Sequence, residues 1–415
     1  MESDKKSSAK DDFVFDKRLY VIFLIMFTEV LGFSMLFPVI PYLGLSLGLT
    51  ESQIGLILSL FSLCQLFASP ITGKLSDHFG RKPLLILSQI STLMGFILLG
   101  FATTVIILIV ARLIDGLLGS NMTVSQAYIS DITEPKHRTR VYSYSSGVFG
   151  AGLIFGPIIG GVLAQINYSV PMFFAASVTV VSIILVVFLP ETINKKTKAI
   201  SFNFNDVIPV NDIKRFQKVQ KIRNSLLMFF VYNTGFFLFM ANFPLFASTQ
   251  FQVTVTETSY FMTWIGILRV IIQTVLISRI LRDLGENKAL VTGIVSMIIS
   301  MIIIIFSADF FIVFIPLVFL AYGTGVCRPI LISQLTNSET TEGTGALLGV
   351  NNSLTSIAQI VTPIVGGFVI EYLPSQILPL LSAVIFILLV VFLRRRSNNE
   401  DDLSIEKKIR ISKNN

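Results

Sequence analysis

The feature that most constrains the fold of this 415-residue chain is a series of apolar runs, each long enough to cross a bilayer. A membrane-spanning helix needs about 20 mostly apolar residues. Such runs begin near Leu19, Ile54, Pro83, Thr104, Tyr142, Val170, Leu226, Ser259, Ala289, Phe310, Gly345 and Gln376. The chain is therefore predicted to be an all-α membrane protein with twelve transmembrane helices, and a soluble enzyme is excluded.

The charged residues indicate how these helices are oriented. Charged residues make up 14% of the sequence, against about 25% in soluble domains, yet the net charge is +7. All Lys and Arg except Arg112, Arg269 and Arg328 fall in the two tails or in alternate connections between the runs. The positive-inside rule then places both termini and the long central loop in the cytoplasm of a cell-membrane protein. Because topology explains the positive charge, no nucleic-acid partner is expected.

One long connection near the chain midpoint divides the apolar runs into two sets of six. The predicted organisation is a cytoplasmic tail, a six-helix bundle, a cytoplasmic loop, a second six-helix bundle and a second cytoplasmic tail, at residues 1–18, 19–189, 190–224, 225–393 and 394–415. Within the loop, residues 212–222 alternate basic and apolar side chains. This pattern fits either a short helix on the inner leaflet or a solvated linker.

The two halves share short sequence echoes in the same order. Residues 156–161, Gly-Pro-Ile-Ile-Gly-Gly, return as residues 362–367, Thr-Pro-Ile-Val-Gly-Gly, after a shift of 206. Leu-Ser-Asp at 75–77 returns as Leu-Arg-Asp at 281–283 after the same shift. The echoes indicate a duplicated six-helix unit, as in transporters whose binding site lies near the membrane midplane.

The connection after the second run carries the most specific motif, Gly-Lys-Leu-Ser-Asp-His-Phe-Gly-Arg-Lys-Pro at residues 73–83. Its glycines permit a tight turn, and its arginine offers a fork to a carboxylate. The segment resembles the loop of the major facilitator superfamily, G-x-L-(S/A)-D-(basic)-x-G-R-(R/K), with histidine at one position where Arg or Lys is usual. The resemblance implies a gating loop that holds the outward-facing state, formed by Gly73, Asp77, Gly80, Arg81 and Lys82 with Asp131 as the partner of the arginine. The alternative is a loop that only fixes topology.

The fifth run contains small residues at regular spacing around a proline. Small residues at this spacing let two helices approach backbone to backbone, and a proline removes a helix donor and bends the rod. The pattern G-x-x-x-G-P-x-x-G-G resembles the antiporter motif of proton-driven exporters in the same superfamily. Its residues are Gly152, Gly156, Pro157, Gly160 and Gly161. Plain helix packing is the alternative.

The first run carries an acid, Glu29, ten residues past Leu19, which is about 15 Å along a helix and near the midplane. An ionised carboxylate there costs at least about 2.5 kcal/mol, so it must be protonated, paired or hydrated. The surrounding Thr-Glu-Val-Leu-Gly-Phe resembles the first helix of the tetracycline/proton antiporters, which usually have Asp at this position. Glu29 is therefore predicted to carry protons; the alternative is a permanent ion pair with Arg112.

The fourth run combines an arginine and an acid with a glycine-rich stretch. Residues 112, 115, 119, 123 and 126 form one polar or small stripe at helical spacing, which is predicted to face the bundle. Arg112 resembles the arginine of the family's motif in this helix, which is implicated in proton coupling. Asp115 is three residues further on and is either a second proton site or the partner of Arg112.

Polar residues inside other runs are candidates for substrate contact. The predicted cavity residues are Asn121, Arg269, Gln273, Asn352 and Gln359. The third and ninth runs carry no acid, although tetracycline exporters have an Asp in both, and this argues against tetracycline as the substrate. Neither Cys64 nor Cys327, each in an apolar run, indicates a disulfide or a metal site.

These features predict a monomeric proton-coupled antiporter that exports a small amphipathic or drug-like molecule by alternating access. Its partners are the substrate, protons and the bilayer, and it needs no cofactor because a proton gradient supplies the energy. A neutral or cationic substrate is preferred. The alternatives are an organic-anion transporter that uses Arg269 and Arg328, and a membrane sensor that does not transport.

Overall fold

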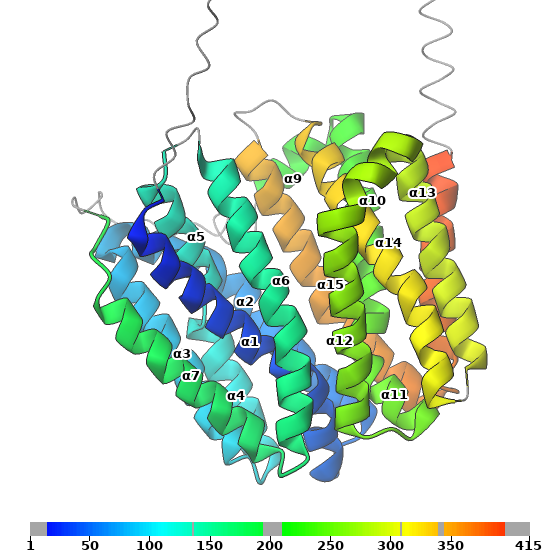
Figure 1. Cartoon of the computed structure of the whole chain (residues 1–415), viewed down its shortest axis with the longest axis horizontal. Helices are drawn as coiled ribbons and strands as arrows, with labels where there is room; N and C mark the ends of the chain where they lie inside the picture. The colour runs from blue at the N-terminus through cyan, green and yellow to red at the C-terminus, as the bar shows by residue number, and fades with distance from the viewer. Residues whose placement is uncertain (1–14, 135–136, 194–209, 308, 339–343, 395–415) are drawn as a thin grey trace, which may run out of the picture.

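The structure is a computed structural model that describes residues 15–134, 137–193, 210–307, 309–338 and 344–394. In these residues the regular secondary structure is helical (Figure 1). The helices are α1 (Lys17–Ser46), α2 (Glu51–Phe79), α3 (Arg81–Gly100), α4 (Val105–Leu118), α5 (Asn121–Ile132), α6 (Arg138–Ala164), α7 (Ser169–Val187), α9 (Val210–Gln217), α10 (Gln220–Met240), α11 (Phe243–Phe251), α12 (Val255–Ile271), the π-helix η2 (Ile272–Leu276), α13 (Ile277–Phe306), α14 (Phe310–Thr336) and α15 (Thr344–Tyr372). A further helix covers Ile377–Arg394.

The helices account for twelve crossings of a membrane. Ten helical stretches are long and apolar enough to span a bilayer, and α10 with α11 forms an eleventh that is bent by 41°. One of the ten, Val255–Phe306, has 52 residues, about 78 Å of helix, which is more than twice the hydrocarbon thickness. Its backbone breaks at Gly285, where φ is 73° and ψ is 163°. The chain reverses there, so the helical stretches before and after Gly285 are separate crossings. With the bent pair, the described residues then form the twelve crossings that the sequence predicts.

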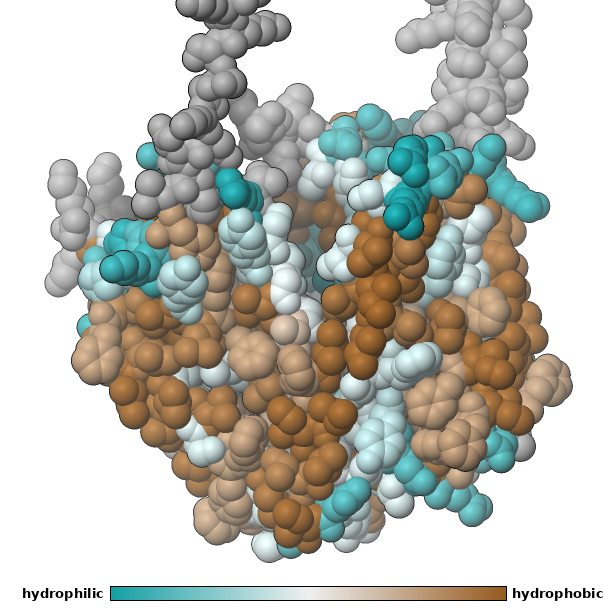
Figure 2. Space-filling view, viewed as in Figure 1, coloured by the Kyte–Doolittle hydropathy of each residue, from teal (hydrophilic) through white to brown (hydrophobic). Residues whose placement is uncertain are grey.

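The surface of the bundle has the distribution that a bilayer requires. On the face shown in Figure 2, hydrophobic residues form a broad belt around the middle and hydrophilic residues gather at the two ends. Large apolar side chains of the membrane-spanning helices are exposed, Val181 and Leu388 among them. The crossings are built from helices, which is how a chain avoids unsatisfied polar groups in lipid.

The described chain begins and finishes at the same end of the bundle, called the tail end below, and the opposite end is called the far end (Figure 1). Helices in both halves begin at the far end with the same device. The side chains of Thr50 at the start of α2 and Thr254 at the start of α12 each accept a hydrogen bond from the backbone amide three residues on. The side chains of those third residues, Gln53 and Glu257, accept from the backbone amides of the two threonines. These capping boxes satisfy amides that the helix itself leaves free.

Hydrophobic packing joins the two halves at the far end and separates them at the tail end. The largest core contains residues of both halves, such as Val39 and Phe243. At the tail end, Leu19 and Leu85 belong to a core made of first-half residues, and Phe216 belongs to one made of second-half residues. The described helices therefore form a bundle that is closed at the far end and divided at the tail end.

Polar contacts strengthen the closure at the far end. The Tyr42 hydroxyl of α1 donates to the carbonyl of Val253 at 2.9 Å, and the Thr256 hydroxyl of α12 donates to the carbonyl of Gly161 at 2.7 Å. The Ser52 amide of α2 donates to the Glu371 carboxylate of α15 at 3.0 Å. Each contact crosses between the halves, so all of them must break before the far end can open.

Part of the predicted central loop is helical. Helix α9 occupies Val210–Gln217 and α10 begins at Gln220. Of the two readings left open for residues 212–222, the short helix agrees with this structure. Residues 194–209 of the loop and most of both predicted tails, 1–14 and 395–415, lie outside the described residues.

Candidate functional site

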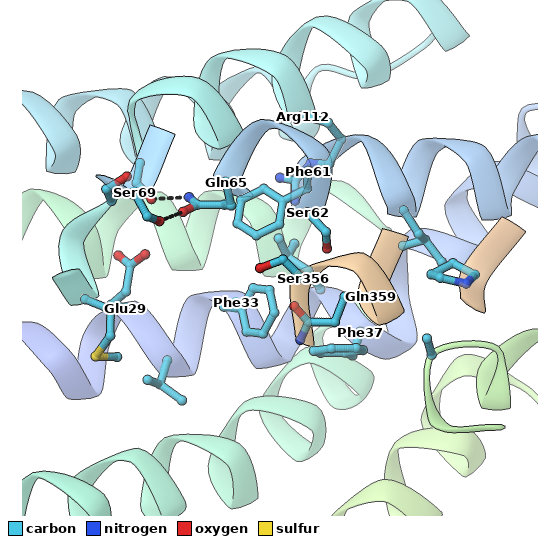
Figure 3. Close-up of a pocket in the computed structure, with 18 of the residues that line it drawn as sticks. Glu29, Phe33, Phe37, Phe61, Ser62, Gln65, Ser69, Arg112, Ser356 and Gln359 are labelled. Atoms are coloured by element: carbon cyan, nitrogen blue, oxygen red, sulfur yellow. Dashed lines mark hydrogen bonds between the residues drawn. The ribbon is translucent and has the colours of Figure 1, made fainter. Parts of the chain in front are cut away.

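A cavity of about 400 Å³ lies between the halves, lined by α1, α2, α4, α5 and α6 of the first half and by α10 and α15 of the second. Figure 3 shows Glu29 toward one end of it, Gln359 and Phe37 toward the other, and the rings of Phe33 and Phe61 between them. Most of its lining is aliphatic or aromatic. Such a cavity suits an amphipathic small molecule, because binding sites of this kind combine apolar walls with a few fixed polar groups.

A continuous chain of polar contacts leads from the cavity into the first half. The Asn121 amide donates to Oε2 of Glu29 at 2.8 Å and to the Thr92 hydroxyl at 3.1 Å. Thr92 donates in turn to Oδ1 of Asp115 at 2.9 Å, and Oδ2 of Asp115 lies 3.6 Å from Nη2 of Arg112. The structure thus brings together the three predicted proton-coupling residues and Asn121. Thr92 was not predicted because a hydroxyl in an apolar run is common.

Arg112 is buried beside the cavity and has Asp115 as its ion-pair partner. Arg112 is 3% exposed and its guanidinium lies 5.6 Å from the ring centre of Phe61. In the part of the chain that the structure describes, its ion pair is with Asp115, and no ion pair joins it to Glu29. Glu29 and Arg112 both line the cavity, whereas Asp115 lies behind it and packs against Gly95.

The fourth crossing is broken where the sequence pattern indicated one continuous stripe. Helix α4 ends at Leu118 and α5 begins at Asn121, and the carbonyl of Gly119 in the gap accepts from the side-chain amide of Gln65. Ser69 donates to the carbonyl oxygen of the same Gln65 side chain at 2.9 Å, as Figure 3 shows. Glycines at 116 and 119 favour the break, since glycine weakens a helix interior.

Gln65 is a cavity residue that the sequence reasoning missed. Together with Ser62 and Ser69 it lines the cavity from α2. These residues are three and four positions apart, so they form a polar stripe in an otherwise apolar helix. The same spacing argument that selected the fourth run would have found them.

The second half contributes fewer of the predicted cavity residues. Gln359 lines the cavity together with Ser356, but Asn352 is exposed and lies outside it. Arg269 and Gln273 are also absent from its lining; Gln273 belongs to the π-helix η2, where the helical register changes. None of these three residues lines this cavity, so a role for them in substrate contact stays a prediction. Spacing along one helix gives a face but not what that face meets.

The predicted antiporter motif lies at two close helix contacts. Gly152, Gly156 and Gly160 of α6 pack directly against α1, where any side chain would collide with Val30, Ser34 or Met35. Gly161 faces Ser259 of α12 across the boundary between the halves. Pro157 lies inside α6.

The predicted gating loop forms an ion-pair network at the tail end of the first half. Nε of Arg81 lies 2.9 Å from Asp131, as predicted, and its Nη2 lies 2.6 Å from Asp77. Arg81 is 7% exposed and also donates to the Ser76 hydroxyl at 2.6 Å. Gly80 between α2 and α3 has φ of 107°, a conformation that favours glycine. Gly73 and Lys82 complete the predicted set.

A second acid, Glu191, takes part in this network and was not predicted. It follows α7 and accepts from the first two amides of α3, those of Arg81 at 2.9 Å and Lys82 at 3.0 Å. Burial by itself raises the pKa of Glu191, but four backbone hydrogen bonds hold that pKa below its ordinary value; the donors are Ile193, Arg81, Lys82 and Thr192. Glu191 thus caps the start of α3, whose own N-cap, Gly80, has no side chain to do so.

Comparison with known proteins agrees with this architecture. A family model described as Major Facilitator Superfamily matches residues 22–352 and 225–412, which confirms the resemblance seen in the sequence. The chain is 28% identical over 374 residues to the class H tetracycline resistance protein of Pasteurella multocida, covering 86% of this chain and 90% of that protein. It is 28% identical over 364 residues to multidrug resistance protein 2 of Bacillus subtilis (strain 168), covering 86% and 89%. The crystal structure of the human organic anion transporter MFSD10 is similar with a TM-score of 0.68 at 20% identity, covering 90% and 98%, and shows the shared fold.

We expect Glu191→Ala to lower the free energy of unfolding by about 1–2 kcal/mol at pH 7, because it removes the cap of α3. The pKa of Glu191 is lower in the folded protein than in the unfolded chain. Its contribution to the free energy of unfolding is therefore complete above the pKa of the unfolded chain and is lost as the pH falls through the pKa of the folded protein. The difference from the parent should therefore shrink in acid. Thermal unfolding in detergent across pH 3–7 measures this, with Glu286→Ala, an exposed acid, as control. Equal stability of Glu191→Ala and parent at pH 7 would contradict the capping role.

Proposed function

The chain belongs to the Major Facilitator Superfamily, and we propose that it is a proton-coupled antiporter that exports a small neutral or cationic amphipathic molecule. It is a multi-pass membrane transporter related to tetracycline and multidrug resistance proteins, and not an enzyme. The identities of 28% leave its substrate open. The proposal therefore rests on the cavity.

The observation that carries the proposal is the position of Glu29 in the wall of that cavity. Its carboxylate is held by one side-chain hydrogen bond, from Asn121, and is open to the cavity on its other side. A carboxylate at this depth is stable as the protonated acid, or as the anion when water or a cation is beside it. Proton and cationic substrate can therefore compete for the same group, which is the exchange that an antiporter needs.

The polar chain behind Glu29 supports this role. Removing the proton from Glu29 leaves a negative charge, which the Asn121 amide stabilises directly. Asn121 is itself held by Thr92, and Thr92 by Asp115, whose charge is balanced by Arg112. We assign Glu29 the proton-carrying role and give Asp115 with Arg112 the role of a fixed pair that sets the local field.

Alternating access follows from the way in which the halves meet. The far end is closed and the tail end divided, so the cavity in this conformation belongs to a state open toward the tail end. The positive-inside pattern assigns the tail end to the cytoplasm. Export then requires the far-end contacts to break, and Gly161 of the antiporter motif lets α6 lie closely against α12 across the boundary between the halves.

The gating loop is assigned the role of holding the tail ends of the first-half helices together during this movement. Arg81 connects the end of α2, through Asp77, with the end of α5, through Asp131. Glu191 connects the segment after α7 to the start of α3. Four helix ends therefore move as one unit when the tail end closes in the outward-facing state.

Neutralising Glu29 tests the proton-carrying role. We expect Glu29→Gln to reduce uphill transport driven by a pH gradient by about 100-fold or more, while exchange of substrate down its own gradient continues. The amide accepts from Asn121 as the acid does but cannot release a proton. The measurement is uptake of a fluorescent hydrophobic cation into proteoliposomes, with Glu286→Gln as control. Uphill transport by Glu29→Gln at the parental rate would exclude Glu29 as the essential carrier.

Neutralising the partner of Arg81 tests the gating role. We expect Asp131→Asn to slow turnover about 3–10-fold with substrate affinity unchanged, because it removes one of two anions around a buried guanidinium. The population should shift toward the state open at the tail end, seen as faster labelling of Ser62→Cys in a background without Cys64 and Cys327. Asp283→Asn is the matched control, since Asp283 pairs with Arg282 at an exposed site in the second half. Weakened binding with unchanged labelling would contradict the gating role.

An organic-anion substrate is the second candidate, and one observation favours it. Arg269 and Arg328 lie within electrostatic reach of each other in the second half, outside the cavity. Two neighbouring cations could hold a carboxylate. We nevertheless expect Arg269→Gln to leave transport of neutral and cationic compounds within about twofold, because Arg269 does not line the cavity. The same assay with an anionic dye decides this: anion transport that is present in the parent and lost in Arg269→Gln, but not in Arg279→Gln, would replace our proposal.

A further inference from the structure

We propose that the groove between α9, the start of α10 and α15 binds one anionic phospholipid from the leaflet at the tail end. Its phosphate would lie among Lys214, Lys218 and Arg223, and its acyl chain would lie against Leu227 and Leu354. This groove has a volume of about 710 Å³ and is separate from the cavity that contains Glu29. Its lining combines exposed basic side chains with a set of apolar ones, which matches the charged head and apolar chains of a phospholipid.

Helix α9 is fixed in place, so its basic side chains have defined positions. Phe216 of α9 is fully buried in a core with Leu335 of α14 and Leu347 of α15. The guanidinium of Arg215 lies 5.3 Å from the ring centre of Phe216 and covers it. A short helix anchored by one aromatic side chain can hold its polar face at the membrane surface, as amphipathic interfacial helices do.

The charge on this face is strongly positive. Residues 210–223 contain five basic side chains and one acid, Asp212, which lies at the opposite end of α9 from Lys218. Lys214 and Lys218 are one helical turn apart, and Arg223 follows in the first turn of α10. All three are exposed and line the groove. The cytoplasmic leaflet carries anionic lipids that attract such clusters.

The apolar part of the groove lies where acyl chains begin. Leu227 and Phe230 are seven and ten residues past the start of α10, about 10–15 Å along the helix. Leu227 is 45% exposed, and Leu354 of α15 faces the same groove. A soluble anion would use the basic side chains and leave the apolar ones uncovered. A lipid covers both, which is why we commit to a lipid.

The position of the groove at the tail end follows from Figure 1, where α9 lies at the end at which the described chain begins and finishes. The groove is built from second-half helices together with the helix that ends the loop between the halves. A bound lipid would fix this junction against the second half. It would not block the cavity, because the two share no lining residue.

The test is native mass spectrometry of the full chain in detergent with added dioleoylphosphatidylglycerol or dioleoylphosphatidylcholine. We expect the parent to retain phosphatidylglycerol at least about tenfold better than the triple variant Lys214→Gln, Lys218→Gln, Arg223→Gln, since each basic residue near a membrane surface favours anionic lipid. The matched control neutralises three exposed basic residues at the same end of the molecule: Arg279→Gln, Arg282→Gln and Lys288→Gln. It should bind within twofold of the parent.

A second variant tests the apolar part and separates a lipid from other anions. Leu354→Trp fills the apolar part of the groove with all charges kept, and should weaken retention of phosphatidylglycerol about as much as the triple variant. Lys214→Arg with Lys218→Arg should bind as the parent does. Equal retention of both lipids by the parent, equal losses in the triple variant and its control, full retention by Leu354→Trp, or displacement by millimolar inorganic phosphate or an acidic peptide would each overturn the proposal.

Discussion

The cost of placing charge in an apolar interior is the constraint on which the rest of this structure depends. Glu29 and Asp115 are acids inside membrane-spanning helices, and each needs a partner or water. The chain of contacts through Asn121 and Thr92 connects them without a direct ion pair between Glu29 and Arg112. Because Arg112 is held by Asp115, Glu29 keeps a free side toward the cavity. A permanent pair at Glu29 would have removed the group that can exchange a proton.

The polar contacts across the far end are single hydrogen bonds, which can be replaced by other hydrogen bonds when that end opens. They are hydrogen bonds from hydroxyl or amide groups, such as Tyr42 to Val253 and Thr256 to Gly161, each worth about 1 kcal/mol net. The glycines at the crossing points add close packing without long side chains that would have to disengage. Each of these hydrogen bonds can be exchanged at a modest cost, but the apolar core that both halves share at the far end must also part before that end opens.

The crossings, the pairing of Arg81 with Asp131 and the acid of the first helix could be predicted from the sequence. Each of them follows from a local pattern or a spacing of residues. The sequence does not reveal the role of Glu191, because this role depends on the segment after α7 meeting the start of α3. The break at Gly119 could not be predicted either, because it depends on a tertiary contact: the side chain of Gln65 compensates for helix hydrogen bonds that are lost there. Nor does the sequence predict that Arg269 lies outside the described cavity, because helical spacing predicts which residues share a face but not what that face meets.

The charges of the cavity come from one half alone among its described lining residues, and this asymmetry has a mechanical consequence. Glu29 and Arg112 belong to the first half, while the second half contributes Gln359, Ser356 and the ring of Phe237. When the halves rock against each other, the proton site keeps its fixed partners because they move with it. A substrate held between the halves loses or gains contacts instead. Under the proposed mechanism, protonation of Glu29 changes substrate affinity in either conformation without rebuilding the polar chain, and the two halves divide the work between proton and substrate.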